Sequence, residues 1–212
     1  MWTWNIINPA FLSGLIFPRF TYRIKNSEDA VFLTFDDGPH PVLTPFVLDA
    51  LAKYGAKATF FMLGCNVEKH PELVKRILDE GHAIGNHTYN HLNGWQTNKS
   101  SYLKDISQAS GIIRSNLFRP PYGRILPSQS KKLMENYKIV MWDVMSYDFH
   151  LEISTEKCLS NVLNHVKPGS IVVFHENDKA FTNLQYVLPK VLEVLSNNGY
   201  RFLPIKDSDL KD

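Results

Sequence analysis

Two adjacent carboxylates, Asp36 and Asp37, stand at the end of an apolar run and are followed directly by Gly38 and Pro39. Adjacent acids at the edge of a sheet repel one another, and a bound cation is one simple way to hold them together. A solvated acidic turn is the alternative, because Asp-Gly is also a common turn signal. By itself the pattern leaves both interpretations open.

A second group of metal-binding side chains lies at His87 and His91. A spacing of four residues would put both imidazoles on one face of a helical turn, where they could share one metal ion. The alternative is two surface histidines in a chain that has eight. One Asp and two His together make three ligands, which leaves open positions for water and substrate, as in catalytic zinc sites. Such a metal acidifies its water and polarises a carbonyl.

The remaining histidines have no partner at such a spacing, and we interpret them as structural or exposed: His40, His70, His82, His150 and His165. Cys65 and Cys158 lie outside any zinc-type spacing. We interpret both as buried free thiols, with a disulfide between them left open.

Short β-rich runs alternate with amphipathic stretches along the chain, and these elements must position the polar groups. The expected strands cover 30–36, 58–63, 82–86, 118–119, 138–143, 170–175 and 200–203. The expected helices cover 44–54, 66–80, 99–116, 127–137, 155–166 and 182–197, the first with Thr44 as its N-cap. This alternation predicts a parallel sheet covered by helices, either a barrel or an open doubly wound sheet.

Ligands of both architectures bind at the carboxyl ends of the strands. The polar residues of interest all follow expected strands: Asp36 and Asp37, His87, Arg119, Asp143 and His175. We therefore expect one site at this edge of the sheet.

Composition excludes several classes of protein. The 212 residues are 44% hydrophobic and 21% charged, which excludes a disordered chain and favours a single domain. The net charge of +2 is too small to indicate nucleic acid or an anionic membrane as a partner. An apolar run at 11–17 is shorter than the roughly 20 residues of a membrane span. It also precedes the first basic residue, Arg19, which is not the order of a cleavable signal peptide.

From about Ala30 to Leu203 the sequence resembles the polysaccharide deacetylases of the NodB-homology type, carbohydrate esterase family 4. Five motifs occur in the family's order: TFDDGP at 34–39, HTYNH at 87–91, RPPY at 119–122, MSYDF at 145–149 and VVFH at 172–175. The resemblance implies an α/β fold, a distorted (β/α) barrel with about seven parallel strands. We expect an N-terminal arm over 1–29 that packs on the domain, a catalytic domain over 30–205 and a C-terminal tail over 206–212. An uncleaved export signal or an interfacial anchor is the alternative for the arm.

The resemblance also implies a metal centre. Asp37, His87 and His91 would hold a divalent metal, with Zn²⁺ as the default and Co²⁺, Ni²⁺, Fe²⁺ or Mn²⁺ as alternatives. Asp36 would be the general base that takes a proton from the attacking water, and Arg119 would tether Asp36 and keep it ionised.

Three further roles follow from the same resemblance. The backbone N–H of Tyr122, together with the metal, would form the oxyanion hole. His175 would be the general acid that protonates the leaving amine of the sugar. Asp148 would orient His175 and raise its pKa.

Some positions depart from the family's pattern. Met145 replaces an acid, Phe149 replaces a Trp that helps to shape the acetyl pocket, and Val173 stands where the family usually has Leu. None of these changes removes a catalytic group, but they leave the acyl group and the substrate open. Trp95, Tyr89 and Tyr147 are further aromatics near the motifs, for stacking on sugars or for ordinary packing.

The resemblance thus implies a metal-dependent hydrolase that removes N-acetyl groups from a glycan of the N-acetylglucosamine type, such as peptidoglycan or a chitin-like polymer. The same chemistry on an O-acetyl ester of xylan or on a small amide or imide is the alternative. A non-catalytic glycan-binding protein is a more distant one, because both Asp36 and His175 are present. No nucleic acid, membrane span or obligate protein partner is implied, and the compartment stays open between cell envelope and cytoplasm.

Overall fold

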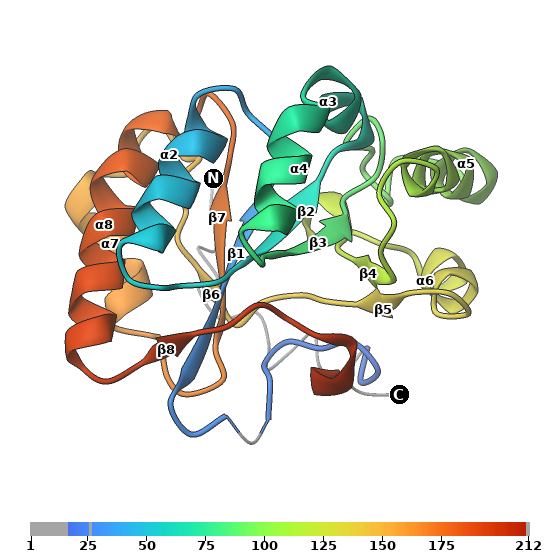
Figure 1. Ribbon diagram of the computed structural model, residues 1–212. Helices are drawn as coiled ribbons and strands as arrows, with labels where there is room; N and C mark the ends of the chain where they lie inside the picture. The colour runs from blue at the N-terminus through green and yellow to red at the C-terminus, as the bar shows by residue number, and fades with distance from the viewer. Residues whose placement is uncertain (1–16, 26, 211–212) are drawn as a thin grey trace.

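The computed structural model describes residues 17–25 and 27–210, and a parallel sheet forms its centre (Figure 1). Its strands are β1 (Ala30–Asp36), β2 (Thr59–Met62), β3 (Ala83–Asn86), β4 (Leu117–Phe118), β5 (Lys138–Ile139), β6 (Val144–Met145), β7 (Ile171–His175) and β8 (Arg201–Phe202). Their spatial order is β6-β7-β1-β2-β3-β4-β5, and β8 pairs with the first residues of β1. All these pairings are parallel, and none joins β5 to β6 in the described part of the chain. The sheet is therefore an open barrel, and the expected distorted barrel of about seven parallel strands is confirmed.

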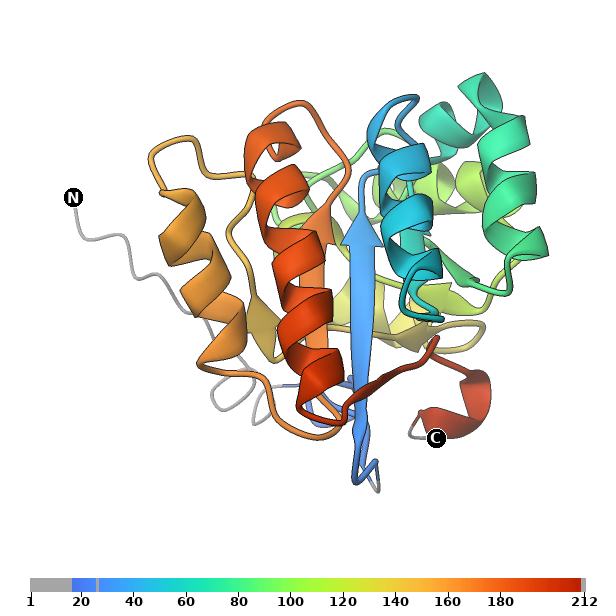
Figure 2. The same cartoon turned by 60° about the vertical axis from the view of Figure 1, so that its left-hand side comes forward.

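The helices form an outer layer around this sheet (Figure 2). They are α2 (Leu43–Ala52), α3 (Gly64–Lys69), α4 (Pro71–Asp79), α5 (Lys99–Ser110), α6 (Pro127–Leu133), α7 (Thr155–Leu163) and α8 (Phe181–Asn197), with short 3-10 turns η1 (Pro121–Gly123) and η2 (Asp207–Asp209). Contacts connect them in the order α7-α8-α2-α4-α3-α5-α6, which parallels the strand order. None of these helices has the length and apolarity needed to span a membrane, as far as the described residues go.

Strand β1 supplies side chains to two apolar cores, one on each face of the sheet. Val31, Leu33 and Phe35 pack in the cluster that includes the buried faces of α2 and α8. Ala30 and Phe32 alternate with them and belong to the cluster on the opposite face. Because side chains alternate along a strand, Thr34 and Asp36 lie on the same face as Ala30 and Phe32. The carboxyl end of β1 thus brings polar groups to the concave side.

The chain before β1 also packs against the sheet. Phe20, Tyr22 and Ile24 are buried in the second cluster, and Thr21 forms a parallel bridge with Val140. Residues 11–16 of the apolar run lie outside the described part of the chain, so the N-terminal arm stays a prediction over most of its length.

Several expected elements differ in their limits. The helices expected at 99–116, 127–137 and 155–166 end earlier, at Ser110, Leu133 and Leu163, and three other differences have a clear structural cause. The helix expected at 44–54 begins at Leu43, and Val42 is its N-cap. Thr44 is not the N-cap, because it lies inside the first turn, where its hydroxyl accepts the His40 N–H at 2.8 Å. The stretch at 66–80 is two helices, since Pro71 begins α4 and disfavours the helical region at His70, whose φ is −134°.

The third difference lies at 138–143, where one strand was expected and two short strands, β5 and β6, flank an irregular segment. In that segment the carbonyls of Val140 and Met141 accept hydrogen bonds from the Arg119 side chain. The Arg119 side chain thus binds the backbone at the point where the strand is interrupted.

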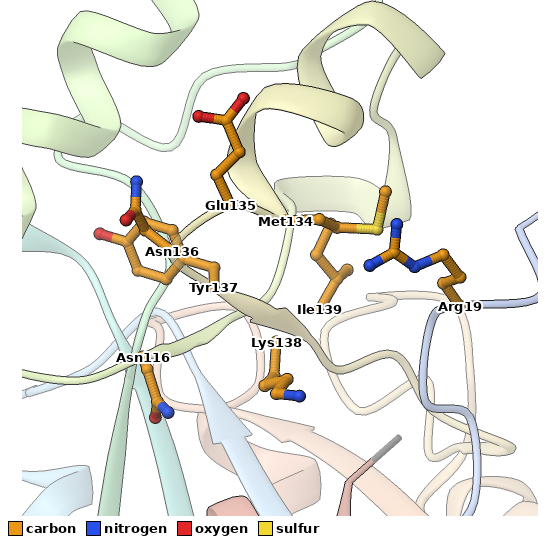
Figure 3. Close-up of a pocket in the computed structure, with 8 residues that line it drawn as sticks. All are labelled: Arg19, Asn116, Met134, Glu135, Asn136, Tyr137, Lys138 and Ile139. Atoms are coloured by element: carbon orange, nitrogen blue, oxygen red, sulfur yellow. The ribbon is translucent and has the colours of Figure 1, made fainter. Parts of the chain in front are cut away.

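A cavity of about 280 Å³ lies between the end of α6 and the first residues of β5 (Figure 3). Arg19, Asn116, Glu135 and Tyr137 are among the residues that line it. Since Asn116 and Lys138 precede or begin their strands, this cavity opens at the amino ends of β4 and β5. It is at the opposite end of the sheet from the carboxylates of β1.

Candidate active site

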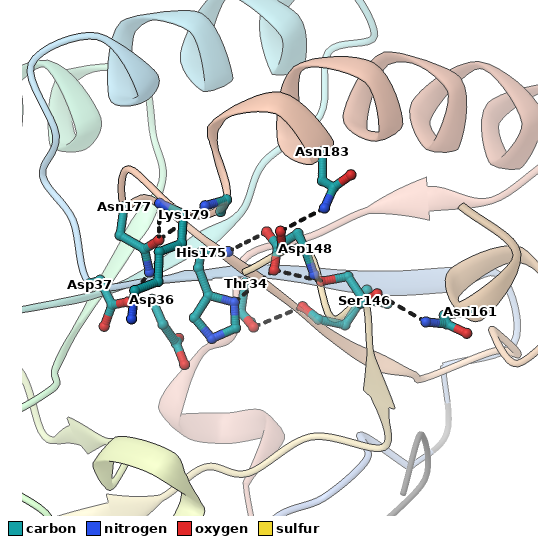
Figure 4. Close-up of polar contacts among 12 residues, drawn as sticks. Thr34, Asp36, Asp37, Ser146, Asp148, Asn161, His175, Asn177, Lys179 and Asn183 are labelled. Carbon is teal, nitrogen blue, oxygen red and sulfur yellow. Dashed lines mark hydrogen bonds and ion pairs between the residues drawn. The ribbon is translucent and has the colours of Figure 1, made fainter. Parts of the chain in front are cut away.

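The two adjacent carboxylates lie at the end of β1 and have different surroundings. Asp36 is the last residue of the strand and lies on its concave face. Asp37 has a φ of 75°, and its N–H donates to the carbonyl of Phe61 at 3.2 Å. This left-handed residue turns the chain at the strand end, so the two side chains have different neighbours (Figure 4). Each carboxylate has its own hydrogen-bond donor, Arg119 for Asp36 and Asn177 for Asp37, and this offsets the repulsion between them.

Asp37, His87 and His91 form the one group of three potential metal ligands found within the described residues. One ligand atom of each lies within 4.8 Å of the others. Asp37 Oδ1 is 3.1 Å from His91 Nε2 and 3.7 Å from His87 Nε2. That oxygen is buried and accepts no hydrogen bond from any described residue. A buried carboxylate oxygen without a hydrogen bond, facing two imidazole nitrogens, fits the ligand set of a divalent cation such as zinc.

The two histidines come together through a loop, so the expected helical turn is wrong. Residues 87–93 follow β3 without helix, and both Thr88 (φ 73°) and His91 (φ 58°) are left-handed. The buried Asp105 of α5 holds the loop in place, because its carboxylate accepts hydrogen bonds from the backbone N–H groups of Tyr89 and Asn90 at 2.8 and 3.1 Å. The two histidines do lie close together, but through the left-handed residues of a loop and not through a helical turn.

Hydrogen bonds at the second ring nitrogens leave both Nε2 atoms directed to Asp37. His87 Nδ1 lies 2.8 Å from the carbonyl of Arg119, to which it donates. Burial lowers the pKa of His87 to about 4, so its ring is neutral near pH 7, as a metal ligand must be. His91 Nδ1 lies 3.1 Å from the hydroxyl of Tyr122. Such outer contacts orient imidazole ligands.

Two asparagines on Asp37 were not found from the sequence. Asn177 Nδ2 donates to Asp37 Oδ2 at 2.7 Å, and Asn66 Nδ2 donates to the Asp37 carbonyl at 2.8 Å. Burial alone would raise the pKa of Asp37, but His91, His175 and His87 hold it well below its usual range. Asn177 follows the strand of His175 by two residues, and that position was the available signal. Asn66 lies in α3 and gave none.

Arg119 is fully buried and ties Asp36 to the sheet. Its Nη1 donates to Asp36 Oδ1 and to Thr34 Oγ1, both at 2.7 Å. Its other nitrogens donate to the two carbonyls of the interrupted strand, and its guanidinium lies 4.1 Å from the centre of the Phe61 ring. A buried cation with every side of its fork satisfied holds a carboxylate in one position.

His175, which is half-buried, and the buried Asp148 form a second pair beside the carboxylates (Figure 4). Asp148 accepts from His175 Nδ1 through Oδ1 and from the His175 backbone N–H through Oδ2, both at 2.8 Å. Burial alone would lower the pKa of His175, but Asp148 outweighs it and raises this pKa to about 9. Ser146 and Asn183 hold Asp148 from behind, at its Oδ1 and its carbonyl. The ring is therefore protonated near pH 7.

Tyr122 lies in the turn η1 with φ 60° and ψ 6°. Its side chain is 59% exposed, and its ring contacts His91 edge-on with 4.6 Å between centroids. The Tyr122 N–H donates no hydrogen bond to any residue that the structure describes. A strained turn thus leaves a free donor next to a potential metal ligand.

The positions that depart from the family's pattern have clear contacts. The Phe149 ring lies 4.6 Å from the His175 ring, and the Tyr147 ring lies 6.0 Å from Phe149. Met145 pairs with Val173 in the β6–β7 ladder, and both are buried. Phe149 thus supplies an apolar wall directly at the imidazole.

One expected member of the site does not belong there. Asp143 accepts from Ser170 Oγ and from the Ile171 N–H, at 2.9 and 2.8 Å, where β7 begins. His175 ends the same strand, so Asp143 lies at the opposite edge of the sheet. The reason is that Asp143 directly precedes β6 and so lies at the amino end of a strand, whereas the sequence predicted it at the carboxyl end of one. Asp143 is a structural group that holds the start of β7.

The chain is similar in sequence and in structure to proteins of one family. The sequence profile of the family described as polysaccharide deacetylase matches residues 23–142. A peptidoglycan-N-acetylglucosamine deacetylase of Bacillus cereus is 40% identical over 197 residues, which cover 88% of this chain and 71% of that protein. The peptidoglycan-N-acetylmuramic acid deacetylase PdaC of Bacillus subtilis is 31% identical, over 86% of this chain and 39% of PdaC. A crystal structure of the Bc1960 peptidoglycan N-acetylglucosamine deacetylase has a TM-score of 0.86 at 35% identity and covers 95% of this chain and 97% of that one.

Proposed function

We propose, because the chain belongs to the polysaccharide deacetylase family, carbohydrate esterase family 4, that it removes the N-acetyl group from N-acetylglucosamine residues of peptidoglycan. We further propose that the reaction depends on a divalent metal held by Asp37, His87 and His91. The products are acetate and the free amine of the sugar. A peptidoglycan substrate would put the reaction at the cell envelope.

One observation carries the proposal: three potential metal ligands, a tethered carboxylate and a protonated imidazole lie at one edge of the sheet. The ligand atoms lie within 4.8 Å of one another, and Asp36 is fixed by Arg119 at 2.7 Å. His175 is charged through Asp148 at 2.8 Å. Neither a storage site for metal nor a binding module has a use for an anionic base and a cationic acid together.

When bound, the divalent cation is a Lewis acid that polarises the acetyl carbonyl and acidifies the attacking water. Asp36, the carboxylate of the two that is not among the potential metal ligands, takes a proton from that water as the water oxygen bonds to the carbonyl carbon. Arg119 holds Asp36 in position throughout, since its own proton cannot be removed. The Tyr122 N–H, which has no internal partner among the described residues, donates to the oxygen that gains charge.

The C–N bond then breaks, and the nitrogen needs a proton to leave as an amine. His175 supplies it, because Asp148 holds Nδ1 and leaves Nε2 as the donor (Figure 4). The two groups begin in opposite states, Asp36 as an anion and His175 as a cation. One site can therefore provide first a base and then an acid.

The choice of peptidoglycan N-acetylglucosamine is supported by the names of two of the most similar proteins. PdaC, at 31% identity, carries a name that specifies N-acetylmuramic acid. The chemistry of the site is the same for both sugars. We therefore favour the first substrate on similarity alone, and the acetyl group on the reactive nitrogen is the common feature.

The test is acetate release from peptidoglycan and from N-acetylglucosamine oligomers, with and without a chelator and with Zn²⁺ restored. We expect release that stops with the chelator and returns with the metal. Release from acetylated xylan alone would replace the amide by an ester. No release from a protein that holds one equivalent of metal would contradict the proposed reaction, and no release without bound metal would favour a non-catalytic role.

A further inference from the structure

A tryptophan and an arginine next to the candidate site form an exposed pair that the proposed reaction does not use. The Trp95 side chain is 61% exposed, and the Arg124 guanidinium lies 5.1 Å from the centre of its ring. An exposed indole of this kind has no role in the cores described above. Trp and Arg are also, with Tyr, the residues enriched at the centres of protein interfaces that contribute most to binding.

The pair is held rigidly by the loops that carry it. Trp95 Nε1 donates to the carbonyl of Ile125 at 3.4 Å, and its backbone N–H donates to Asn93 Oδ1 at 3.0 Å. Gln129, fully buried, donates to the carbonyls of Gly94 and Thr97 at 2.9 and 3.0 Å.

Gly94 shows how closely the two loops pack. A Cβ there would collide with the Arg124 carbonyl and lie 3.1 Å from Ile125 Cα. The loop after β3 and the segment after η1 are therefore one unit, and a ligand on it finds the aromatic face already in place.

The same two loops carry ligands and donors of the candidate site. Trp95 follows His91 by four residues, and Arg124 follows Tyr122 by two, so its Cα is at most about 7.6 Å away. Tyr122 in turn contacts His91. The pair thus lies at the distance of a neighbouring saccharide rather than of the acetyl group itself.

The charge of Arg124 points to the chemistry of that neighbour. Within the described part of the chain the Arg124 guanidinium forms no ion pair, and it lies over the Trp95 ring. A guanidinium fixed on an aromatic ring presents a planar fork that matches a carboxylate. A neutral chitin-like chain offers no carboxylate, whereas the lactyl group or the peptide of peptidoglycan does.

We propose that Trp95 and Arg124 form a subsite for a carboxylate-bearing saccharide next to the sugar that is deacetylated. Trp95 stacks on the sugar ring, and Arg124 pairs with its carboxylate. This inference rests on the proposed function for the place of the reacting sugar. It also explains how the chain would prefer peptidoglycan over a neutral polymer of N-acetylglucosamine.

The test measures binding, so that it does not depend on turnover. All proteins carry Asp36→Asn, so that the glycan is not deacetylated during the measurement, and are loaded with metal. Calorimetry then gives the Kd of three glycans of equal length. One is a neutral N-acetylglucosamine oligomer, one carries free lactyl carboxylates, and one carries peptides. We expect Arg124→Gln to raise the Kd of the carboxylated glycans roughly fivefold, which is the effect of an exposed charged pair. The Kd of the neutral glycan should not change. Arg114→Gln removes an equal, exposed charge and should change none.

Two further variants separate the roles within the pair. Because the Trp95 ring stacks on the sugar, Trp95→Ala should weaken the binding of all three glycans. If that variant fails to fold, Trp95→Phe should show the same effect at a smaller size. Arg124→Lys should keep most of the preference, and about 1 M salt should abolish it. An Arg124→Gln protein that weakens neutral and carboxylated glycans equally, or neither, overturns the subsite.

Acetate release from the same glycans by the protein with Asp36 intact is measured in parallel. Absence of release contradicts the proposed function, whereas the ratio of Kd values alone decides the subsite. If only the lactyl or only the peptide glycan responds to Arg124→Gln, that carboxylate is the one recognised.

Discussion

Arg119 shows how a single buried charge organises the candidate site. Its guanidinium binds Asp36 and Thr34 on β1, its carbonyl orients His87, and its remaining nitrogens bind the backbone where the strand expected at 138–143 is interrupted. A buried arginine is costly unless its charge is paired and all its donors are used. Here Asp36 pairs with the charge and each of the three side-chain nitrogens donates at least one hydrogen bond, so the role of Arg119 is to fix positions rather than to react.

The pair of His175 and Asp148 allows a prediction about turnover. Replacing His175 by Ala should lower kcat by about 10²–10⁴, the usual range for one general acid. Asp148→Asn should also lower it, because the imidazole loses the anion that keeps it charged. Both are measured as acetate release at saturating metal. Asp178→Asn, at an exposed carboxylate three residues beyond His175, is the control and should leave kcat unchanged.

At the level of elements, the sequence predicted best those strands and helices whose limits depend on their own residues alone. Strand β1 begins and ends where expected, because six apolar or small residues followed by an acid suit a buried parallel strand with a polar carboxyl end. The histidine loop could not be predicted in this way. Its path depends on left-handed residues at Thr88 and His91 and on Asp105, which is distant in sequence. Long-range side-chain bonds to backbone have no periodic pattern that reveals them.

His82, which begins the segment of β3, should make stability depend on pH. Its Nδ1 accepts the Ala58 N–H at 3.1 Å, which connects β3 to the start of β2. Burial lowers its pKa to about 4, with Lys57 and Arg76 acting in the same direction and Glu80 opposing them. The unfolded chain takes up the proton near pH 6.5. This contribution is therefore complete above pH 6.5 and is lost as the pH falls from 6.5 to about 4.

His82→Asn keeps an acceptor at the Nδ1 position and removes the titration. The free energy of unfolding, measured with urea from pH 7 to pH 4, should fall less steeply in the variant by up to about 3 kcal/mol. Its stability at pH 7 should be somewhat lower, because the edge contact of the ring with Phe60 is lost. An equal slope in both proteins would contradict the assignment of this acid sensitivity to His82.

For the whole molecule, the alternation of elements was enough to predict a parallel sheet with its site at the carboxyl edge, and the resemblance to the family was needed to choose the barrel over an open doubly wound sheet. The alternation could not predict that residues 20–24 pack against the sheet, or that Asp143 lies at the opposite edge. Both depend on the spatial order of the strands. The neighbours β6, β7 and β1 are not consecutive in the sequence, so their order cannot be read from the alternation of elements. Nor did it indicate Glu176, whose buried carboxyl fills the space that a Cβ at Gly38 would need.

Metal binding should stabilise the whole molecule, since its ligands come from the ends of two different strands. Zinc at about 100 times its Kd contributes about 2.7 kcal/mol, which raises Tm by about 5–10 °C for a chain of this length. His87→Ala should abolish the rise, whereas His70→Ala, at a half-buried histidine outside the site, should keep it. Calorimetric scans with and without metal measure both. The same rise in His87→Ala would mean that the metal binds elsewhere.

The most direct measurement compares acetate release per bound metal ion in the wild-type protein and in Asp36→Asn. The substitution removes the carboxylate tethered by Arg119 and leaves Asp37, His87 and His91 untouched. We expect one equivalent of metal in both proteins and a loss of turnover of at least about 10²-fold in the variant. Release near the wild-type rate at equal metal content would contradict Asp36 as the base, and with it the proposed mechanism.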